Sequence, residues 1–302
     1  MARIHNYNSF SGLEKLKEIV AEQDPAMSEE LMKALFPFRD KNIGETLDKI
    51  ISRFESSANY NTPKEWFTQK EFNTFMDYFQ RKLTKKKTEE IESGLNQFTM
   101  VMPAEANIEA IGDFTDTEQI LRLKQPTNNV LQDLRNAGIS NIDNMEFISL
   151  KLLKCYYHRV HCPVNGIIQD IVFIGRENPL FGHNSLWIVS LSSEHGMVYM
   201  LLVGELSIQD FTFNMDKGAT VKKFDELGHF NWGSQLVLIY ERDSFRGDVL
   251  LEEKQKYFVG DGIFSNIKVI DPTEWGSMPN TQFTRNDLKT GLTLGTGETG
   301  PI

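Results

Sequence analysis

The sequence predicts an α+β protein, with a helical N-terminal region followed by a β-rich domain. Apolar residues recur at helical spacing in the first 95 residues, and alternating or β-branched runs begin near Thr99. The 302 residues are enough for one or two domains. We expect a helical region (1–95), a β-rich domain (96–275) and a flexible C-terminal tail (276–302) that is rich in Thr and Gly.

The helical region carries both spacing and capping signals. Apolar residues at helical spacing predict helices near residues 13–20 and 47–54. Thr62 stands before Pro63 and three positions before Glu65, which is the pattern of a capping box at the start of a helix. We therefore expect an aromatic-rich helix to follow, with its aromatic face toward the core.

A basic cluster comes directly after this aromatic stretch, and it has two interpretations. Beside an aromatic face, the cations can hold a helix against anionic lipid. At the end of a solvated helix, they interact favourably with the helix dipole instead. The cluster consists of Arg81, Lys82, Lys85, Lys86 and Lys87.

Strand and helix signals alternate in the β-rich domain. Runs of apolar and β-branched residues between Gly, Asn and Asp predict strands at 167–174, 186–191, 197–208 and 235–240. Helical patterns intervene near residues 128–137 and 144–157.

Composition excludes several classes of protein. The net charge of −10 disfavours a nucleic-acid partner, because a uniformly acidic surface repels phosphates. There is no run of about 18 apolar residues that would predict a transmembrane helix, and the first residues lack the apolar core of a signal peptide. With two cysteines, Cys155 and Cys162, we expect reduced thiols in a cytoplasmic protein.

Two histidines three positions apart, His158 and His161, are the first candidates for chemistry. On a helix they would share a face, and in a turn before a strand both can point into one cleft and exchange protons near pH 7. With Cys162 they are also metal-ligand types. Because no second cluster supplies the remaining ligands, we expect no metal.

Two further segments carry candidate groups. The Gly233-Ser234 pair stands at the entrance to the strand expected at 235–240, without the Gly-x-Ser-x-Gly pattern of a hydrolase nucleophile elbow. Glu105 is the single carboxylate of a short apolar segment, 101–106. Taken alone, the pair is typical of a turn and the glutamate indicates little.

Together and in this order, the segments resemble the phosphatidylserine decarboxylase family, over roughly residues 98–265. One family motif, Tyr-His-Arg-x-His-x-Pro-x-x-Gly, matches Tyr157, His158, Arg159, His161, Pro163 and Gly166. A second, Lys-Gly-x-Glu-x-Gly-x-Phe leading to Gly-Ser, is similar to Lys223, Glu226, Gly228, Phe230, Gly233 and Ser234. Phe224 replaces a glycine of the second motif, and Leu186 replaces an arginine usual in the family.

The resemblance implies a proenzyme that cleaves itself between Gly233 and Ser234 and converts Ser234 into a pyruvoyl cofactor. That carbonyl acts as an electron sink when the substrate loses CO₂. The resemblance assigns His158 to decarboxylation and His161 to activation of the serine, with Glu105 in place of the aspartate that partners this histidine. It also implies that the two cleaved chains stay associated, and it leaves a homo-oligomer open.

Two departures bear on self-cleavage. Glu105-Ala106 stands where the family has Asp-Gly, and Gln235 stands where it usually has Thr or Ser. The substrate implied is phosphatidylserine, with peripheral membrane contact. A decarboxylase of a soluble amino acid or small peptide is one alternative, and an unprocessed binding or scaffold protein is the other.

Overall fold

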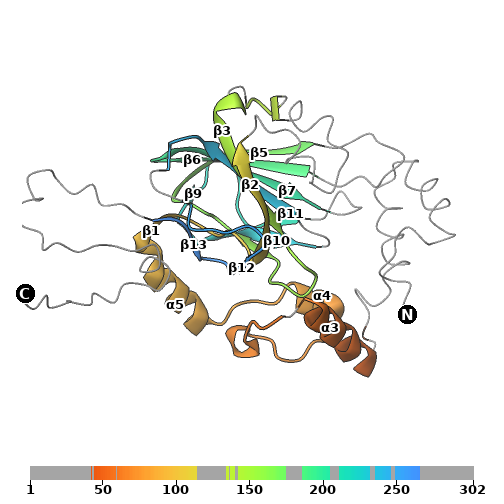
Figure 1. Cartoon of the computed structure of the whole chain (residues 1–302). Helices are drawn as coiled ribbons and strands as arrows, with labels where there is room; N and C mark the ends of the chain where they lie inside the picture. Colours follow the sequence, from red (N-terminus) through yellow and green to blue (C-terminus); the bar gives the residue numbers. More distant parts are fainter. Residues whose placement is uncertain are drawn as a thin grey trace, which may run out of the picture.

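The structure is a computed structural model, and it describes residues 42, 44–58, 60–113, 134–135, 137–139, 142–174, 186–204, 211–231, 235–245 and 249–265. In this part of the chain, the α-helices lie below the strands in the view of Figure 1, some at the lower left and others at the lower right. The α-helices are α3 (Glu45–Ser57), α4 (Phe75–Phe79) and α5 (Lys85–Gly94), and the 3-10 turns are η3 (Lys64–Trp66), η4 (Leu95–Gln97) and η5 (Ile142–Asn144). The predicted α+β class is confirmed.

Most strands belong to one antiparallel sheet of eight strands, in the order β12-β2-β3-β11-β7-β6-β5-β9. A three-stranded sheet has the order β4-β10-β8, and β1 pairs with β13. The bounds are β1 (Phe98–Val101), β2 (Ala106–Asp113), β3 (Met145–Lys151), β4 (Arg159–His161), β5 (Gly166–Ile174), β6 (Leu186–Ser193), β7 (Gly196–Val203), β8 (Phe211–Phe213), β9 (Thr220–Val221), β10 (Glu226–Phe230), β11 (Gln235–Glu241), β12 (Lys256–Tyr257) and β13 (Gly262–Ser265).

The strand predictions are confirmed by β5, β6, β7 and β11, within the described residues. The helix expected at 144–157 is wrong, because β3 occupies Met145–Lys151. This strand lies between β2 and β11, and most of its residues are buried. A strand buried on both faces loses its alternation of polar and apolar residues, so its sequence resembles a buried helix.

The helix near 47–54 is confirmed as α3, but the capping box expected at Thr62 is wrong. The structure has its capping box at Thr74 and Asp77, at the start of the short helix α4. The Thr62 hydroxyl donates instead to Glu105 Oε1 at 2.6 Å, and only the 3-10 turn η3 follows it. The expectations for residues 13–20 and 276–302, and most of the helix near 128–137, lie outside the described residues.

Helices α3 and α4 share a core with the sheet. One hydrophobic cluster contains Leu47 and Ile51 of α3 and Phe79 of α4, together with Ile148 of β3 and Leu236 of β11. Burying such side chains is worth about 2 kcal/mol each, which fixes the helices to the strands. The domain boundary at 95/96 stays a prediction, since this packing joins both sides of it.

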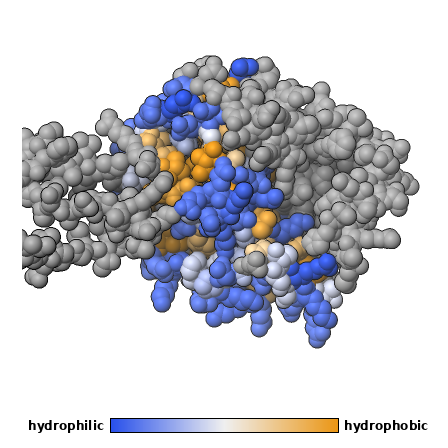
Figure 2. All heavy atoms as spheres, in the orientation of Figure 1, coloured by the Kyte–Doolittle hydropathy of each residue, from blue (hydrophilic) through white to orange (hydrophobic). Residues whose placement is uncertain are grey.

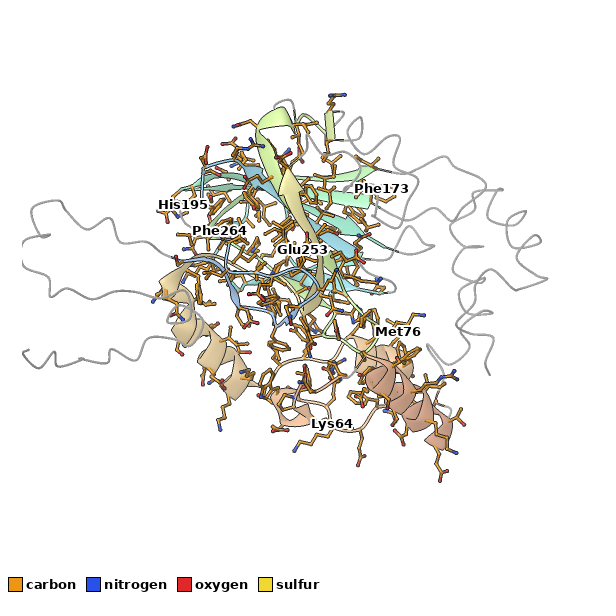
Figure 3. All side chains as sticks on the ribbon, viewed as in Figure 1. Lys64, Met76, Phe173, His195, Glu253 and Phe264 are labelled. Atoms are coloured by element: carbon orange, nitrogen blue, oxygen red, sulfur yellow. The ribbon has the colours of Figure 1, made fainter. Side chains whose placement is uncertain are left out.

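Two observations on the described residues bear on membrane contact. None of the helices in the described ranges is long and apolar enough to cross a bilayer. Figure 2 shows mainly hydrophilic residues along the lower edge of the molecule, where the helices lie. Figure 3 places Lys64 and Met76 at this helical end, away from Phe173 and His195 near the strands.

Candidate active site

The two histidines lie at the two ends of β4: His158 directly precedes this strand and His161 is its last residue, and β4 pairs antiparallel with β10. His161 ends β4 and lies opposite Glu226, while the Phe230 N–H donates to the His158 carbonyl at 3.0 Å. β10 ends at Phe230, four residues before Ser234. Gly233 and Ser234 themselves lie outside the described residues. The ladder therefore sets both histidines beside the strand that leads to the expected cleavage bond.

The two hydrogen bonds of His161 indicate its tautomer, and its burial indicates its charge. Nδ1 lies 2.6 Å from the Phe224 carbonyl, and a carbonyl only accepts, so Nδ1 carries the proton. Nε2 lies 3.0 Å from the Tyr157 hydroxyl, which donates to it. Burial lowers the pKa of His161 below its ordinary 6.5. The ring is thus neutral near pH 7, with the lone pair of a general base on Nε2.

His158 has different surroundings. Its Nδ1 lies 2.8 Å from the Tyr156 carbonyl, and its ring stacks on Phe79 of α4 with centroids 3.5 Å apart. The His161 ring stacks on Phe224 instead, at 4.4 Å. Phe79 and Phe224 belong to different hydrophobic clusters. The two rings therefore pack against different aromatic partners, as expected for side chains three positions apart along an extended segment, which point to opposite faces.

Phe224 holds an unusual backbone conformation. It replaces the glycine of the family motif, and its φ is +74°, in the left-handed region that favours glycine. Such a conformation costs about 1–2 kcal/mol for a residue with a side chain. The chain keeps the glycine-like turn, and this turn presents the carbonyl that binds His161.

Glu105 is fully buried in the turn between β1 and β2. Its Oε2 accepts the Tyr157 backbone N–H at 2.7 Å, and its Oε1 lies 2.6 Å from Thr62 Oγ1 and 2.9 Å from Lys256 Nζ. None of its contacts within the described ranges is with His161. Tyr157 lies between them, with its N–H on Glu105 and its hydroxyl on His161.

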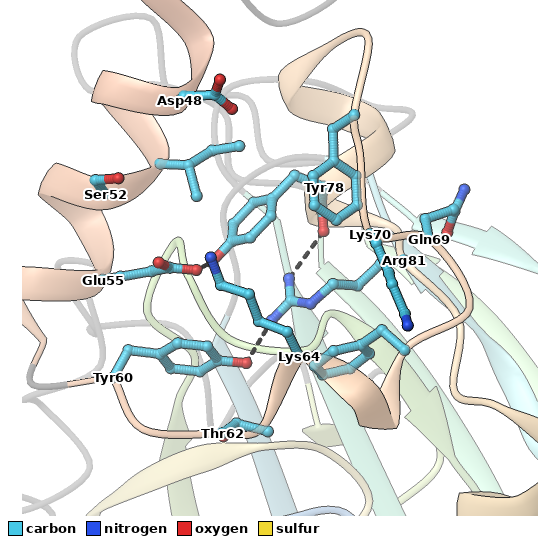
Figure 4. A pocket seen from close by; sticks show the side chains of 13 residues that line it. Asp48, Ser52, Glu55, Tyr60, Thr62, Lys64, Gln69, Lys70, Tyr78 and Arg81 are labelled. Carbon is cyan, nitrogen blue, oxygen red and sulfur yellow. Dashed lines mark hydrogen bonds between the residues drawn. The ribbon is translucent and has the colours of Figure 1, made fainter.

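Arg81 is buried, so it cannot belong to a lipid-facing patch. Its guanidinium donates to the carbonyls of Tyr78 (2.8 Å), Cys155 (2.7 Å) and Tyr156 (3.1 Å) and to the Tyr60 hydroxyl at 2.6 Å. These bonds fix the turn that leads into the histidine motif. Arg81 and Thr62 both line a pocket of about 180 Å³, and Figure 4 shows their side chains in its wall.

The remaining basic residues of the cluster differ in their burial and in their partners. Lys87 is buried, lies 3.7 Å from the Trp66 ring centroid and pairs with Glu90 at 2.8 Å. Lys85 is exposed and pairs with Glu89 at 3.7 Å. The cluster therefore divides into two buried residues, Arg81 and Lys87, and three exposed ones, Lys82 before α5 and Lys85 and Lys86 in its first turn.

Sequence reasoning missed several residues at this site. From the sequence, Thr62 was interpreted as a helix cap and Phe79 as an ordinary core residue. Lys256 carried no signal, because only the pairing of β12 with β2 brings it near Glu105. Tyr157 was visible in the motif, but its contacts with both Glu105 and His161 depend on the folded turn.

Comparisons with known proteins cover much of the chain. The family model described as Phosphatidylserine decarboxylase matches residues 75–265. "Phosphatidylserine decarboxylase proenzyme 3" of Schizosaccharomyces pombe is 30% identical over 202 residues, which are 61% of this chain and 21% of that longer protein. "Phosphatidylserine decarboxylase proenzyme" of Vibrio parahaemolyticus is 26% identical over 254 residues, 72% of this chain and 87% of the relative. The protein of that name from Geobacillus sp. (strain WCH70) is 25% identical over 208 residues, 64% and 78% of the two chains.

Proposed function

Because the chain belongs to the phosphatidylserine decarboxylase family, a family of carboxy-lyases, we propose that it cleaves its own Gly233–Ser234 bond and then decarboxylates phosphatidylserine. The observation that carries the proposal is the neutral His161 on β4, paired with the strand that leads to Ser234. A neutral imidazole can take the proton of a serine hydroxyl, which is a poor nucleophile until a base activates it.

In the proposed cleavage, a base takes the Ser234 hydroxyl proton and Oγ attacks the Gly233 carbonyl carbon. The C–N bond breaks as the C–O ester bond forms, and the freed nitrogen takes up a proton. Loss of the Ser234 Cα proton then breaks the Cβ–Oγ bond and releases Gly233 as a carboxylate. The remaining enamine takes up water and loses ammonia, which leaves pyruvoyl at the start of the smaller chain.

The burial of the residues before and after the 231–234 segment is compatible with a pyruvoyl group at Ser234. Phe230 and Gln235 are both buried, so β10 ends and β11 begins at residues that are shielded from water. Once formed, the pyruvoyl carbonyl supplies an electron-accepting group for loss of CO₂. His158 is held by the Tyr156 carbonyl and Phe79, and we assign it to the decarboxylation step.

Phosphatidylserine is the substrate named by the family, and a bilayer substrate implies peripheral membrane contact. We assign this contact to the exposed lysines of α5, Lys85 and Lys86, because Arg81 and Lys87 are buried. A soluble amino acid remains the competing substrate.

The first test is a gel and mass measurement of the purified full chain. Cleavage yields fragments of 233 and 69 residues, with a blocked N-terminus on the smaller. Ser234→Ala should abolish both cleavage and CO₂ release. A chain that stays intact after long incubation would indicate an unprocessed binding protein. CO₂ release from free amino acids but not from dispersed phosphatidylserine would replace the lipid substrate by a soluble one.

A further inference from the structure

A β-bulge changes the aim of one carboxylate near the expected cleavage site. In the pairing of β2 with β3, Ile108 lies opposite Leu150 and Ala110 lies opposite Ser149. Glu109 is therefore an extra residue in β2. A bulge of this kind bends the strand and re-aims a side chain, and bulges are common next to active sites.

The re-aimed Glu109 carboxylate reaches across β3 to β11. Its Oε2 accepts from Gln235 Nε2 at 3.0 Å, and its Oε1 pairs with Lys151 Nζ at 3.2 Å. Gln235 also lies 3.3 Å from the Ser149 hydroxyl. Because β3 stands between β2 and β11, this cluster ties three neighbouring strands together at the row where β11 begins.

We propose that Glu109 is a positioning residue for self-cleavage, which acts by holding Gln235, the residue directly after Ser234. The inference rests on the proposed function. Gln235 is 1% exposed, and a buried primary amide needs an acceptor for its N–H groups. Glu109 supplies the charged acceptor and the Ser149 hydroxyl a second one, so the pair of Glu109 and Gln235 fixes the residue that follows Ser234.

The Glu109 and Gln235 pair also explains how the chain accommodates its departure from the family. Threonine or serine, usual after the processed serine, has a short side chain that could not extend to Glu109 in the same way. The glutamine side chain is longer, and its terminal amide needs a hydrogen-bond acceptor. Without that acceptor the reacting segment would shift, and a displacement of about 1 Å can cost about 100-fold in rate.

The test follows self-cleavage of full-length chains made by cell-free synthesis, with the fraction cleaved read from gels over time. Glu109→Ala should slow cleavage by about tenfold or more, whereas Glu109→Gln, whose amide oxygen still accepts from Gln235, should stay closer to the parent rate. In a Gln235→Thr background, Glu109→Ala should have no further effect. The control is Asp170→Ala on β5, three strands from β11, because this change breaks an exposed ion pair with Lys217.

The outcomes separate the two proposals. If the parent chain cleaves and Glu109→Ala cleaves equally fast, the positioning role is overturned while the proposed function stands. If Glu109→Ala slows cleavage as much in the Gln235→Thr background as in the parent chain, Glu109 acts through the fold in general and the inference fails. If the parent chain never cleaves, both proposals fail. If Glu109→Ala cleaves slowly and the added change Gln235→Thr restores the cleavage rate, the positioning role is supported.

Discussion

The Tyr157 hydroxyl lies 3.0 Å from His161 Nε2, on the nitrogen whose lone pair a general base must use. Burial raises the pKa of this phenol, so it remains protonated and keeps donating. Under the proposed function, a proton taken from Ser234 would reach His161 through Tyr157, or the Tyr157 hydroxyl would have to move first. Tyr157 also joins His161 to Glu105, through its backbone N–H.

Tyr157→Phe should slow self-cleavage by at least about tenfold, because it removes the hydroxyl that contacts the base. The free energy of unfolding should fall by only about 1 kcal/mol, the usual worth of one hydrogen bond. Tyr156→Phe is the matched control, since that hydroxyl bonds to Asn107 instead. Equal cleavage rates for the two variants would contradict a role of the Tyr157 hydroxyl.

Lys256→Met should destabilise the fold by about 3 kcal/mol, because it leaves the buried Glu105 carboxylate without the cation 2.9 Å away. The measurement is urea unfolding in the uncleavable Ser234→Ala chain. Lys217→Met, which breaks an exposed pair with Asp170, should change stability little. Similar losses for both lysines would show that Glu105 does not depend on its partner.

Phe79→Leu should reduce decarboxylation more than self-cleavage, because the ring that orients His158 is lost while apolar volume is largely kept. His158→Ala should show the same separation more strongly, whereas His161→Ala should stop cleavage. Phe75→Leu, in the same helix, controls for packing. If Phe79→Leu blocks cleavage as well, the division of roles between the histidines is wrong.

The lowered pKa of His161 predicts an acid limb of the cleavage rate with its midpoint below pH 6.5, the ordinary value for histidine. The same shift makes stability pH-dependent. Between the folded pKa and 6.5 the unfolded chain binds the proton and the folded chain does not, so stability is complete above 6.5 and falls as the pH decreases. Removing the histidine, as in His161→Gln in the Ser234→Ala chain, should reduce this slope between pH 7 and 5. An unchanged slope would contradict the assignment.

Lys85→Glu with Lys86→Glu should weaken pelleting with vesicles that contain anionic lipid, since each cation near such a surface contributes about 1 kcal/mol. Lys87 is left in place because it packs on Trp66. The charge-matched control is Lys49→Glu with Arg53→Glu on α3, which should have a smaller effect. If both pairs of changes act alike, the effect is one of net charge and α5 is not the contact.

The sequence predicted the strands better than the helical region. Runs such as 186–191 and 235–240 have the composition of buried strands and short turns around them, so local pattern suffices. Thr62 was assigned to a helix cap because its true partner, Glu105, is 43 positions away and depends on tertiary structure. β3 was assigned to a helix because a strand that is buried on both faces lacks alternation.

The candidate site was predicted as a set of residues but not as an arrangement. The motif identified His158, His161 and Glu105 by resemblance. It did not indicate that the histidine rings pack on Phe79 and Phe224, or that Tyr157 lies between Glu105 and His161. These contacts depend on strand register and on the turn at residues 154–156, which no local pattern encodes.

The position of β11 determines how the protein can refold. β11 lies between β3 and β7, yet under the proposed cleavage it belongs to the smaller chain. Before cleavage, folding is a first-order event in a single chain. After cleavage, recovery from denaturant becomes second order, because two separate polypeptides must meet before the middle of the sheet can form. Renaturation of the processed protein should therefore depend on its concentration, whereas that of the uncleaved chain should not.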